Sequence, residues 1–136
     1  MRIVINSESR LLHILRGVVR LHAQEAGFSE ADAEGLAMAI DEAAANVIRH
    51  TYGERSDARL ALEIRTLSDR LEFDLEDWGP KVCAEQIHHR PLEDVRPGGL
   101  GTYFISCFMD TSSYDQNFAE GNRLKMIKYL PRKVVT

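Results

Sequence analysis

The feature that most constrains this chain is a long helical pattern over residues 30–50, in which the polar residues near the end gather on one side. At about 100° per residue, the apolar residues and alanines of this segment fill the opposite side. The polar arc consists of Glu42, Asn46, Arg49 and His50. A carboxylate and a carboxamide at positions i and i+4 can act on one point in space. The pair suits an oxygen-liganded Mg²⁺ together with a general base, and the same arc also suits an ordinary solvent-exposed helix face.

Length and composition indicate one soluble domain over residues 1–136. A chain of 136 residues is long enough to bury a sizeable core, and its 44% hydrophobic and 28% charged residues are typical of globular proteins. The net charge of −4 gives no globally basic surface for nucleic acid or anionic membranes. No apolar run approaches the roughly 20 residues that span a bilayer, and the N-terminus has no signal-peptide pattern. We therefore expect a cytoplasmic protein that binds neither nucleic acid nor membrane.

The segment before the polar arc predicts a strand followed by two helices. Residues 2–6 alternate and are β-branched, which is typical of a short strand. Ser7 or Ser9 is then expected to cap a helix that ends just before Gly27, a natural residue for the position after a helix. Ser29 is expected to cap the second helix, which carries the polar arc.

The next segment predicts a β-hairpin. Residues 60–64 and 71–75 alternate between apolar and polar side chains on either side of a turn at Ser68-Asp69, so one face of the hairpin should be buried. Continuing the inward-facing set by two residues reaches Asp77. A buried carboxylate without partners costs on the order of several kcal/mol, so Asp77 needs a hydrogen-bond donor. A ligand amino group would serve, and an aspartate that simply begins a turn is the alternative.

The last third combines a loop, a glycine-rich turn and two strands. Residues 81–97 lose periodicity, and loops beyond about 12–15 residues are often functional lids. Three glycines within residues 98–101 precede an apolar helical segment at residues 102–109, where backbone N–H groups and the helix N-terminus can approach an anion. Residues 111–116 and 123–130 are expected to form two more strands around a turn.

These pieces occur in a recognisable order. Glu42 and Asn46 lie on a helix. Asp77-Trp78-Gly79 then follows a hairpin, and Gly98-Gly99-Leu100-Gly101 opens a later helix. The ordered set resembles the GHKL ATPase superfamily, and more narrowly the anti-sigma-factor serine kinases of the RsbW and SpoIIAB type. The resemblance implies an α/β fold, an α+β two-layer sandwich of the Bergerat ATP-binding type with a mixed, mostly antiparallel sheet and helices on one face.

The resemblance also implies a role for each matching residue. Asn46 would ligate Mg²⁺, and Glu42 would act as general base toward the attacking hydroxyl. Asp77 would accept a hydrogen bond from the exocyclic amino group of adenine, and Gly79 would let the backbone approach the base. The phosphates of ATP would lie against the glycine box, which comprises Gly98, Gly99, Leu100, Gly101 and the following Thr102.

The resemblance implies partners as well. In this family the phosphate acceptor is a serine or threonine of a small anti-sigma-factor antagonist, and the kinase is commonly a homodimer that also binds a sigma factor. We therefore expect ATP and Mg²⁺ as cofactors, these proteins as partners, and Arg49 or Arg96 as a further cation near the γ-phosphate. Two other interpretations stay open. One is a non-catalytic, ATP-gated module of the same fold that holds a partner. The other is the ATPase domain of a sensor histidine kinase, although nothing here resembles its dimerisation helix pair.

Overall fold

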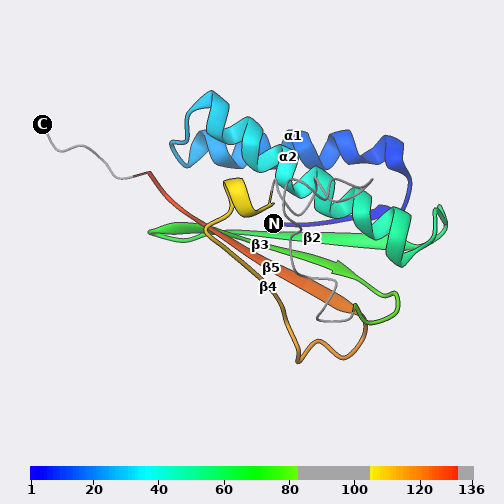
Figure 1. Ribbon diagram of the computed structural model, residues 1–136. Coiled ribbons are helices and arrows are strands. Elements are labelled where there is room, and N and C mark those ends of the chain that lie inside the picture. Colours follow the sequence, from blue (N-terminus) through cyan, green and yellow to red (C-terminus); the bar gives the residue numbers. More distant parts are fainter. Residues whose placement is uncertain (83–104, 132–136) are drawn as a thin grey trace, which may run out of the picture.

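A five-stranded sheet carries helices on one of its faces in the computed structural model, which describes residues 1–82 and 105–131 (Figure 1). The strands are β1 (Arg2–Asn6), β2 (Arg59–Thr66), β3 (Arg70–Asp77), β4 (Thr111–Tyr114) and β5 (Asn122–Tyr129). They follow the order β1-β2-β3-β5-β4, and each neighbouring pair is antiparallel. The predicted α+β sandwich with a mostly antiparallel sheet is confirmed. The strand predicted to end at Gln116 stops at Tyr114.

The helical layer comes mainly from the first half of the chain. Its elements are a short 3₁₀ helix η1 (Ser9–Leu11), α1 (Leu12–Glu25), α2 (Glu30–Asn46) and a π-helical turn η2 (Val47–Thr51). Residues 105–108 are also helical and lie on the same side of the sheet (Figure 1). The helix predicted over residues 30–50 is therefore present, and its last turn is wound as π rather than α.

The junction between α1 and α2 forms as its sequence predicts. Gly27 adopts a φ of 96°, a left-handed conformation that glycine reaches without strain. The N–H of Phe28 donates to the carbonyl of Ala23 at 3.0 Å, which is the long bond of a Schellman motif. Ser29 then caps α2, because its hydroxyl accepts a hydrogen bond from the N–H of Asp32 at 3.1 Å.

The predicted cap of the first helix is wrong. Ser7 is 1% exposed, and its hydroxyl donates to the carbonyl of Arg55 and accepts from the N–H of Ala58 at 3.2 Å. Ser9 lies inside η1, and neither η1 nor α1 has a side-chain cap. A buried hydroxyl requires a partner. Here the loop before β2 supplies that partner, so Ser7 joins the end of β1 to the start of β2 instead of capping a helix.

The core lies between the helices and the inner face of the sheet. Inward side chains of β2 and β3 are almost fully buried, namely Leu60, Leu62, Ile64, Leu71, Phe73 and Leu75. Buried alanines on α2 allow the helix to pack closely within this core. At Gly35 a Cβ atom would lie only 2.2 Å from the ring of Phe108, so the absence of a side chain lets residues 105–108 approach α2.

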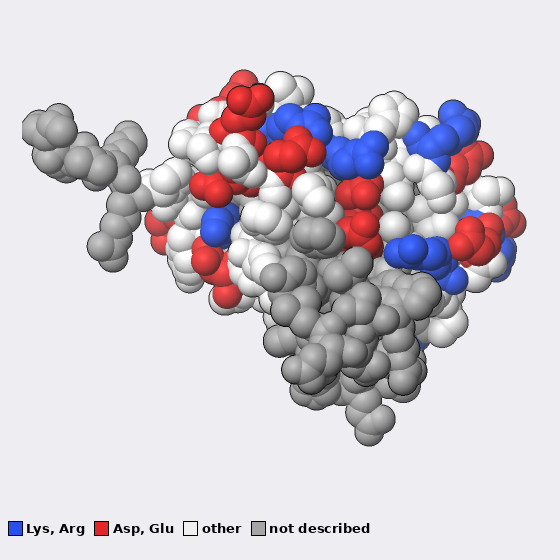
Figure 2. Space-filling model, turned by 45° about the horizontal axis from the view of Figure 1, so that its top comes forward, with Lys and Arg blue, Asp and Glu red and all other residues white. Residues whose placement is uncertain are grey.

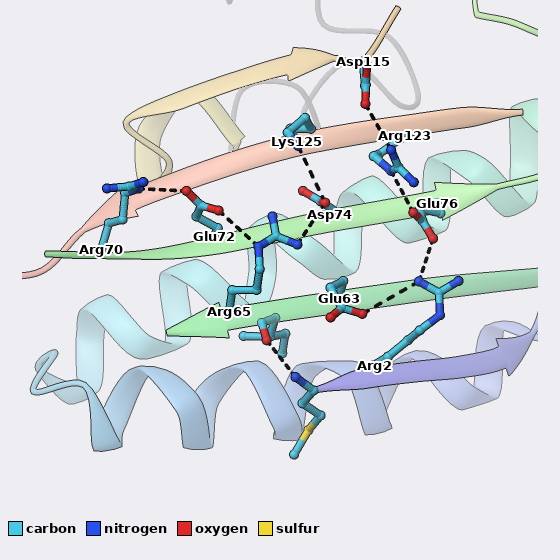
Figure 3. Close-up of polar contacts among 12 residues, drawn as sticks. Arg2, Glu63, Arg65, Arg70, Glu72, Asp74, Glu76, Asp115, Arg123 and Lys125 are labelled. Atoms are coloured by element: carbon cyan, nitrogen blue, oxygen red, sulfur yellow. Dashed lines mark hydrogen bonds and ion pairs between the residues drawn. The ribbon is translucent and has the colours of Figure 1, made fainter. Parts of the chain in front are cut away.

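The outer face of the sheet carries a network of ion pairs, drawn in Figure 3 with the helices behind it. Asp74 and Glu76 point outward from β3, yet they are only 6% and 5% exposed. Arg2 and Arg123 each donate to Glu76 at 2.7 Å, and Arg65 donates to Asp74 at 3.1 Å. The hairpin was predicted to bury only its apolar face, whereas the long arginine side chains also bury the carboxylates of the other face.

Burial and ion pairing act in opposite directions on Glu76. Burial disfavours the charged carboxylate, but hydrogen bonds and charge from Arg2 and Arg123 outweigh this effect and lower the pKa of Glu76 below its ordinary value. The glutamate is therefore held as a carboxylate in the outer network.

Charge is mixed on the helical side as well. In Figure 2, acidic and basic side chains of the described residues lie beside one another on that face instead of forming separate areas. Within residues 1–82 and 105–131, no helix combines the length and apolarity needed to cross a membrane.

Candidate active site

Asp77 is the last residue of β3, and it is only 3% exposed. Its Oδ1 accepts hydrogen bonds from Nδ2 of Asn122 and from the N–H of Gly79, both at 3.0 Å. Burial raises the pKa of Asp77 and outweighs the two hydrogen bonds, which act in the opposite direction. The predicted inward orientation is confirmed, and the protein itself supplies part of the hydrogen bonding that a buried carboxylate requires.

Asn122 is a residue of this site that the sequence analysis missed. It is 4% exposed and is paired with Asp77 in the register of β3 and β5. Its Nδ2 also donates to the carbonyl of Pro80 at 2.8 Å, and its Oδ1 accepts from the N–H of Val82 at 2.9 Å. Asn122 therefore holds both the carboxylate of Asp77 and the backbone of Pro80 and Val82, which follow Asp77 in the chain. In the sequence it is indistinguishable from a turn asparagine, because the register of two strands 45 residues apart is not visible there.

Two glycines allow close packing around Asp77. A Cβ atom at Gly79 would lie 2.3 Å from Cγ2 of Thr51, and one at Gly121 would lie 2.0 Å from the carbonyl oxygen of Asp77. A side chain at Gly121 would collide with the backbone of Asp77, whereas one at Gly79 would have to displace the side chain of Thr51. The expectation that Gly79 lets the backbone approach a nucleotide base stays a prediction.

Tyr52 connects the end of the helix to the strand end that bears Asp77. Its hydroxyl donates to the carbonyl of Arg59 at 2.6 Å and accepts from the N–H of Trp78 at 2.8 Å. Burial raises the pKa of this phenol, so it stays neutral and can keep both bonds at physiological pH. The end of η2, the start of β2 and the end of β3 are therefore tied at a single buried hydroxyl.

Two members of the polar arc, Glu42 and Asn46 at the end of α2, contact the guanidinium group of Arg49 on η2. Nη2 of Arg49 lies 3.1 Å from Oδ1 of Asn46 and 3.9 Å from Oε2 of Glu42. Glu42 and Asn46 are half-buried, whereas Arg49 and His50 are exposed. The predicted pair of a carboxylate and a carboxamide on one face is confirmed, and Arg49 contacts both members.

The donor set fits Mg²⁺ and an adenine nucleotide. The side-chain oxygen of Asn46 is a hard ligand of the kind that Mg²⁺ accepts, with waters and phosphates completing the shell. The described residues hold no cluster of three or more acidic, histidine or cysteine side chains suited to a metal, so phosphate oxygens would have to contribute. A buried carboxylate two positions before Gly79, a residue without a side chain, suits a flat base with an amino group.

The glycine box and Arg96 are the residues expected at the phosphate end of the site. Gly98, Gly99, Leu100, Gly101 and Thr102, together with Arg96, lie outside the described residues. Their roles stay predictions that follow from the resemblance.

Comparison with known proteins covers nearly the whole chain. The family described as histidine kinase-like ATPase domain matches residues 5–128. The chain is 30% identical to a serine-protein kinase RsbW of Bacillus cereus, over 96% of this chain and 85% of that protein. It is 27% identical to the protein of the same name from Halalkalibacterium halodurans, over 96% of this chain and 83% of the relative. A third RsbW, from Oceanobacillus iheyensis, is 28% identical over 88% of this chain and 82% of the relative.

Proposed function

Since the chain belongs to the histidine kinase-like ATPase domain family, we propose that it is an anti-sigma factor that uses ATP and Mg²⁺ to phosphorylate a small antagonist protein. Its relatives named serine-protein kinase RsbW support assignment as a protein serine/threonine kinase. The single observation that carries the proposal is a contact that joins two half-sites, namely the helix end with Glu42 and Asn46 and the strand end with Asp77. The buried Tyr52 hydroxyl ties the end of the Glu42 and Asn46 helix to the residue that follows Asp77.

The two half-sites divide the work of binding. Asp77 would accept the adenine amino group through its carboxylate, with Gly79 next to the base. Asn46 would hold Mg²⁺ through its side-chain oxygen, and the glycine box at residues 98–102 would lie against the phosphates. When bound, the metal would neutralise developing charge on the transferred phosphoryl group. These assignments rest on the chemistry of the donors and on the matched family.

Glu42 is the proposed general base. Its carboxylate stands one helical turn from Asn46, so it would lie near the γ-phosphate of a nucleotide whose metal is held by Asn46. It would accept the proton of the attacking serine or threonine hydroxyl while the new P–O bond forms and the bond to ADP breaks. Phosphoryl transfer depends mainly on positioning and charge neutralisation, and Glu42 and Asn46 would supply a base and a metal ligand from one helix.

A phosphotransfer assay with radiolabelled ATP, Mg²⁺ and a cognate antagonist tests this function. The wild-type chain should phosphorylate the antagonist on serine or threonine. Glu42→Ala should lower transfer by about a hundredfold or more, as expected for loss of a general base, while ATP binding persists. The matched control is Glu34→Ala, which removes an exposed glutamate from the same helix and should leave transfer unchanged. Normal transfer by Glu42→Ala would refute the assignment of the base.

A second function, an ATP-gated binding module without transfer, is favoured by one contact. Arg49 already occupies both Glu42 and Asn46, and a guanidinium that stayed there would block both proposed roles. Titration calorimetry combined with the phosphotransfer assay separates the two functions. Tight ATP binding together with no phosphorylation of any co-purified partner would favour the module.

We also propose the remaining partners and the context of the chain. A sigma factor would be sequestered, the chain would act as a homodimer in the cytoplasm, and residues 1–136 would form one domain. The RsbW relatives support the sigma-factor partner, and the homodimer, the location and the single domain follow from the resemblance alone. Light scattering of the purified chain, alone and with a candidate sigma factor, should give the mass of a dimer and of its complex.

A further inference from the structure

Arg49 makes a contact that the proposed roles of the site do not explain. Its Nη2 lies within hydrogen-bonding distance of Oδ1 of Asn46, at 3.1 Å, and within ion-pairing distance of Oε2 of Glu42, at 3.9 Å. One cation thus touches the proposed metal ligand and the proposed base at the same time. It can do so because Arg49 follows Asn46 by three positions, so the two side chains share a face of the helix end.

A metal ion and this guanidinium compete for the same oxygen. Mg²⁺ binds its oxygen ligands at about 2.1 Å in near-octahedral geometry. A guanidinium bonded to Oδ1 of Asn46 would then stand within a few ångströms of a doubly charged ion, where like charges repel. Binding of the metal ion at Asn46 therefore disfavours the contact of Arg49.

Arg49 can leave at little cost. Its side chain is 41% exposed and its partner Glu42 is 32% exposed, so the pair is partly solvated. Solvated ion pairs contribute little to stability. The arginine also belongs to the π-helical turn η2 and lies outside the buried core. The contact is therefore weak enough to be displaced.

We propose that Arg49 is a positioning residue that acts as an exchangeable counter-cation. Without nucleotide, it contacts both Glu42 and Asn46 and offsets the negative charge of Glu42, and binding of Mg²⁺ with ATP displaces it. This inference rests on the proposed function, because it requires that Asn46 ligates Mg²⁺. It further implies that Arg49 partly sets the Mg²⁺ concentration that ATP binding requires.

Calorimetric titration of ATP into the protein at a series of Mg²⁺ concentrations tests the exchange. The quantity compared is the Mg²⁺ concentration that gives half of the full gain in ATP affinity. In Arg49→Met this concentration should fall by about two- to fivefold, because a competitor worth about one exposed ion pair is gone. Arg49→Lys keeps the charge without the planar fork, so its midpoint should lie between those of Arg49→Met and the wild type.

The matched control is Arg20→Met. Arg20 of α1 forms an exposed ion pair with Glu34 of α2, at 2.7 Å, and its loss changes the net charge by the same amount. Because Glu34 lies eight positions before Glu42, or about 12 Å along the helix axis, the control should leave the Mg²⁺ midpoint unchanged. Both variants should retain the wild-type circular dichroism spectrum.

Different results refute different statements. An unchanged midpoint in Arg49→Met, with normal binding by the wild type, would overturn the exchange and leave the proposed function intact. A raised midpoint would also overturn it, since Arg49 would then assist the bound nucleotide instead of competing with the metal. Failure of the wild type to bind ATP at any Mg²⁺ concentration would refute the proposed function itself, and the inference with it.

Discussion

Two donors approach one oxygen of Asp77, and this asymmetry decides how the carboxylate can be used. Asn122 and Gly79 both bond to Oδ1. Among the described residues no hydrogen bond to Oδ2 is found, so this oxygen is the one suited to a ligand amino group. The orientation does not depend on Asp77 alone, because Asn122 is itself held by bonds to Pro80 and Val82.

Substitution of Asn122 should therefore damage both stability and binding. Asn122→Ala leaves a buried carboxylate with one donor fewer and removes the bonds to two backbone groups, so it should lower the free energy of unfolding by about 1–3 kcal/mol. ATP affinity should fall by about tenfold or more, since the carboxylate loses its fixed orientation. Urea denaturation and calorimetry measure the two effects. Asn117→Ala, at an exposed turn position, is the control, and equal behaviour of both variants would contradict a positioning role for Asn122.

The raised pKa of Asp77 predicts that neutralising this side chain does not destabilise the protein, unlike the loss of Asn122. Because the pKa is higher in the folded than in the unfolded chain, the contribution of Asp77 is most favourable below the unfolded value of about 3.9. It is lost as pH rises toward the folded value. Asp77→Asn should remove this loss, so its stability at pH 7 should equal or exceed that of the wild type while ATP binding disappears. Denaturation at pH 3 and pH 7 checks the sign, and a variant destabilised only at pH 7 would contradict it.

At the scale of elements, the junction of α2, η2 and the hairpin positions the site. The α-helical winding ends at Asn46 and a π turn follows. Such turns often occur at functional sites. Tyr52 comes directly after η2 and reaches two strands at once. The same junction brings Thr51 against Gly79. The half of the proposed site that would bind the metal and the half that would bind adenine are joined here.

Removing the Tyr52 hydroxyl should loosen this junction. Tyr52→Phe keeps the ring in the core but leaves the carbonyl of Arg59 and the N–H of Trp78 without their partner, at a cost of about 1–3 kcal/mol in unfolding free energy. ATP affinity should fall because the two half-sites are no longer held at a fixed separation. Tyr129→Phe, at a side chain that is 50% exposed, should change neither quantity. A stable Tyr52→Phe variant with wild-type affinity would show that the junction is held by packing alone.

For the whole molecule, the two faces of the sheet are stabilised by different forces. Apolar burial under the helices holds the inner face, whereas arginines, lysine and carboxylates interlock on the outer face (Figure 3). The outer network links β1, β2, β3 and β5 through Glu76, Asp74 and their partners. It replaces a second apolar layer, so the outer face stays polar although two of its carboxylates are buried.

This network predicts a loss of stability in acid. The lowered pKa of Glu76 means that its contribution is fully present above the unfolded value of about 4.3, and that it is lost as pH falls through the lower folded value. Glu76→Gln should therefore be destabilised by about 1–3 kcal/mol at pH 7 and by much less near pH 2. Glu120→Gln, at an exposed position of the β4–β5 turn, is the control in urea denaturation at both pH values. A pH-independent difference for Glu76→Gln would contradict the ion-pair origin.

The sequence alone determined the features that depend on neighbouring residues. Helical and alternating periodicities located the helices and strands. The parity of β3 placed Asp77 inside, and the i and i+4 spacing placed Glu42 and Asn46 on one face. Gly27 and Ser29 were predictable because a left-handed turn and an N-cap need only a few adjacent groups.

The tertiary structure decided which distant groups meet. Asn122 bonds to Asp77 because β5 pairs with β3 in one register. Ser7 bonds to the loop before β2 instead of capping a helix, and arginines from three strands bury Glu76 and Asp74. No local pattern contains these contacts, because a hydrogen bond between residues far apart in the chain depends on how whole elements pack. The sequence therefore determined which residues could perform the chemistry, and the packing decided how they are held.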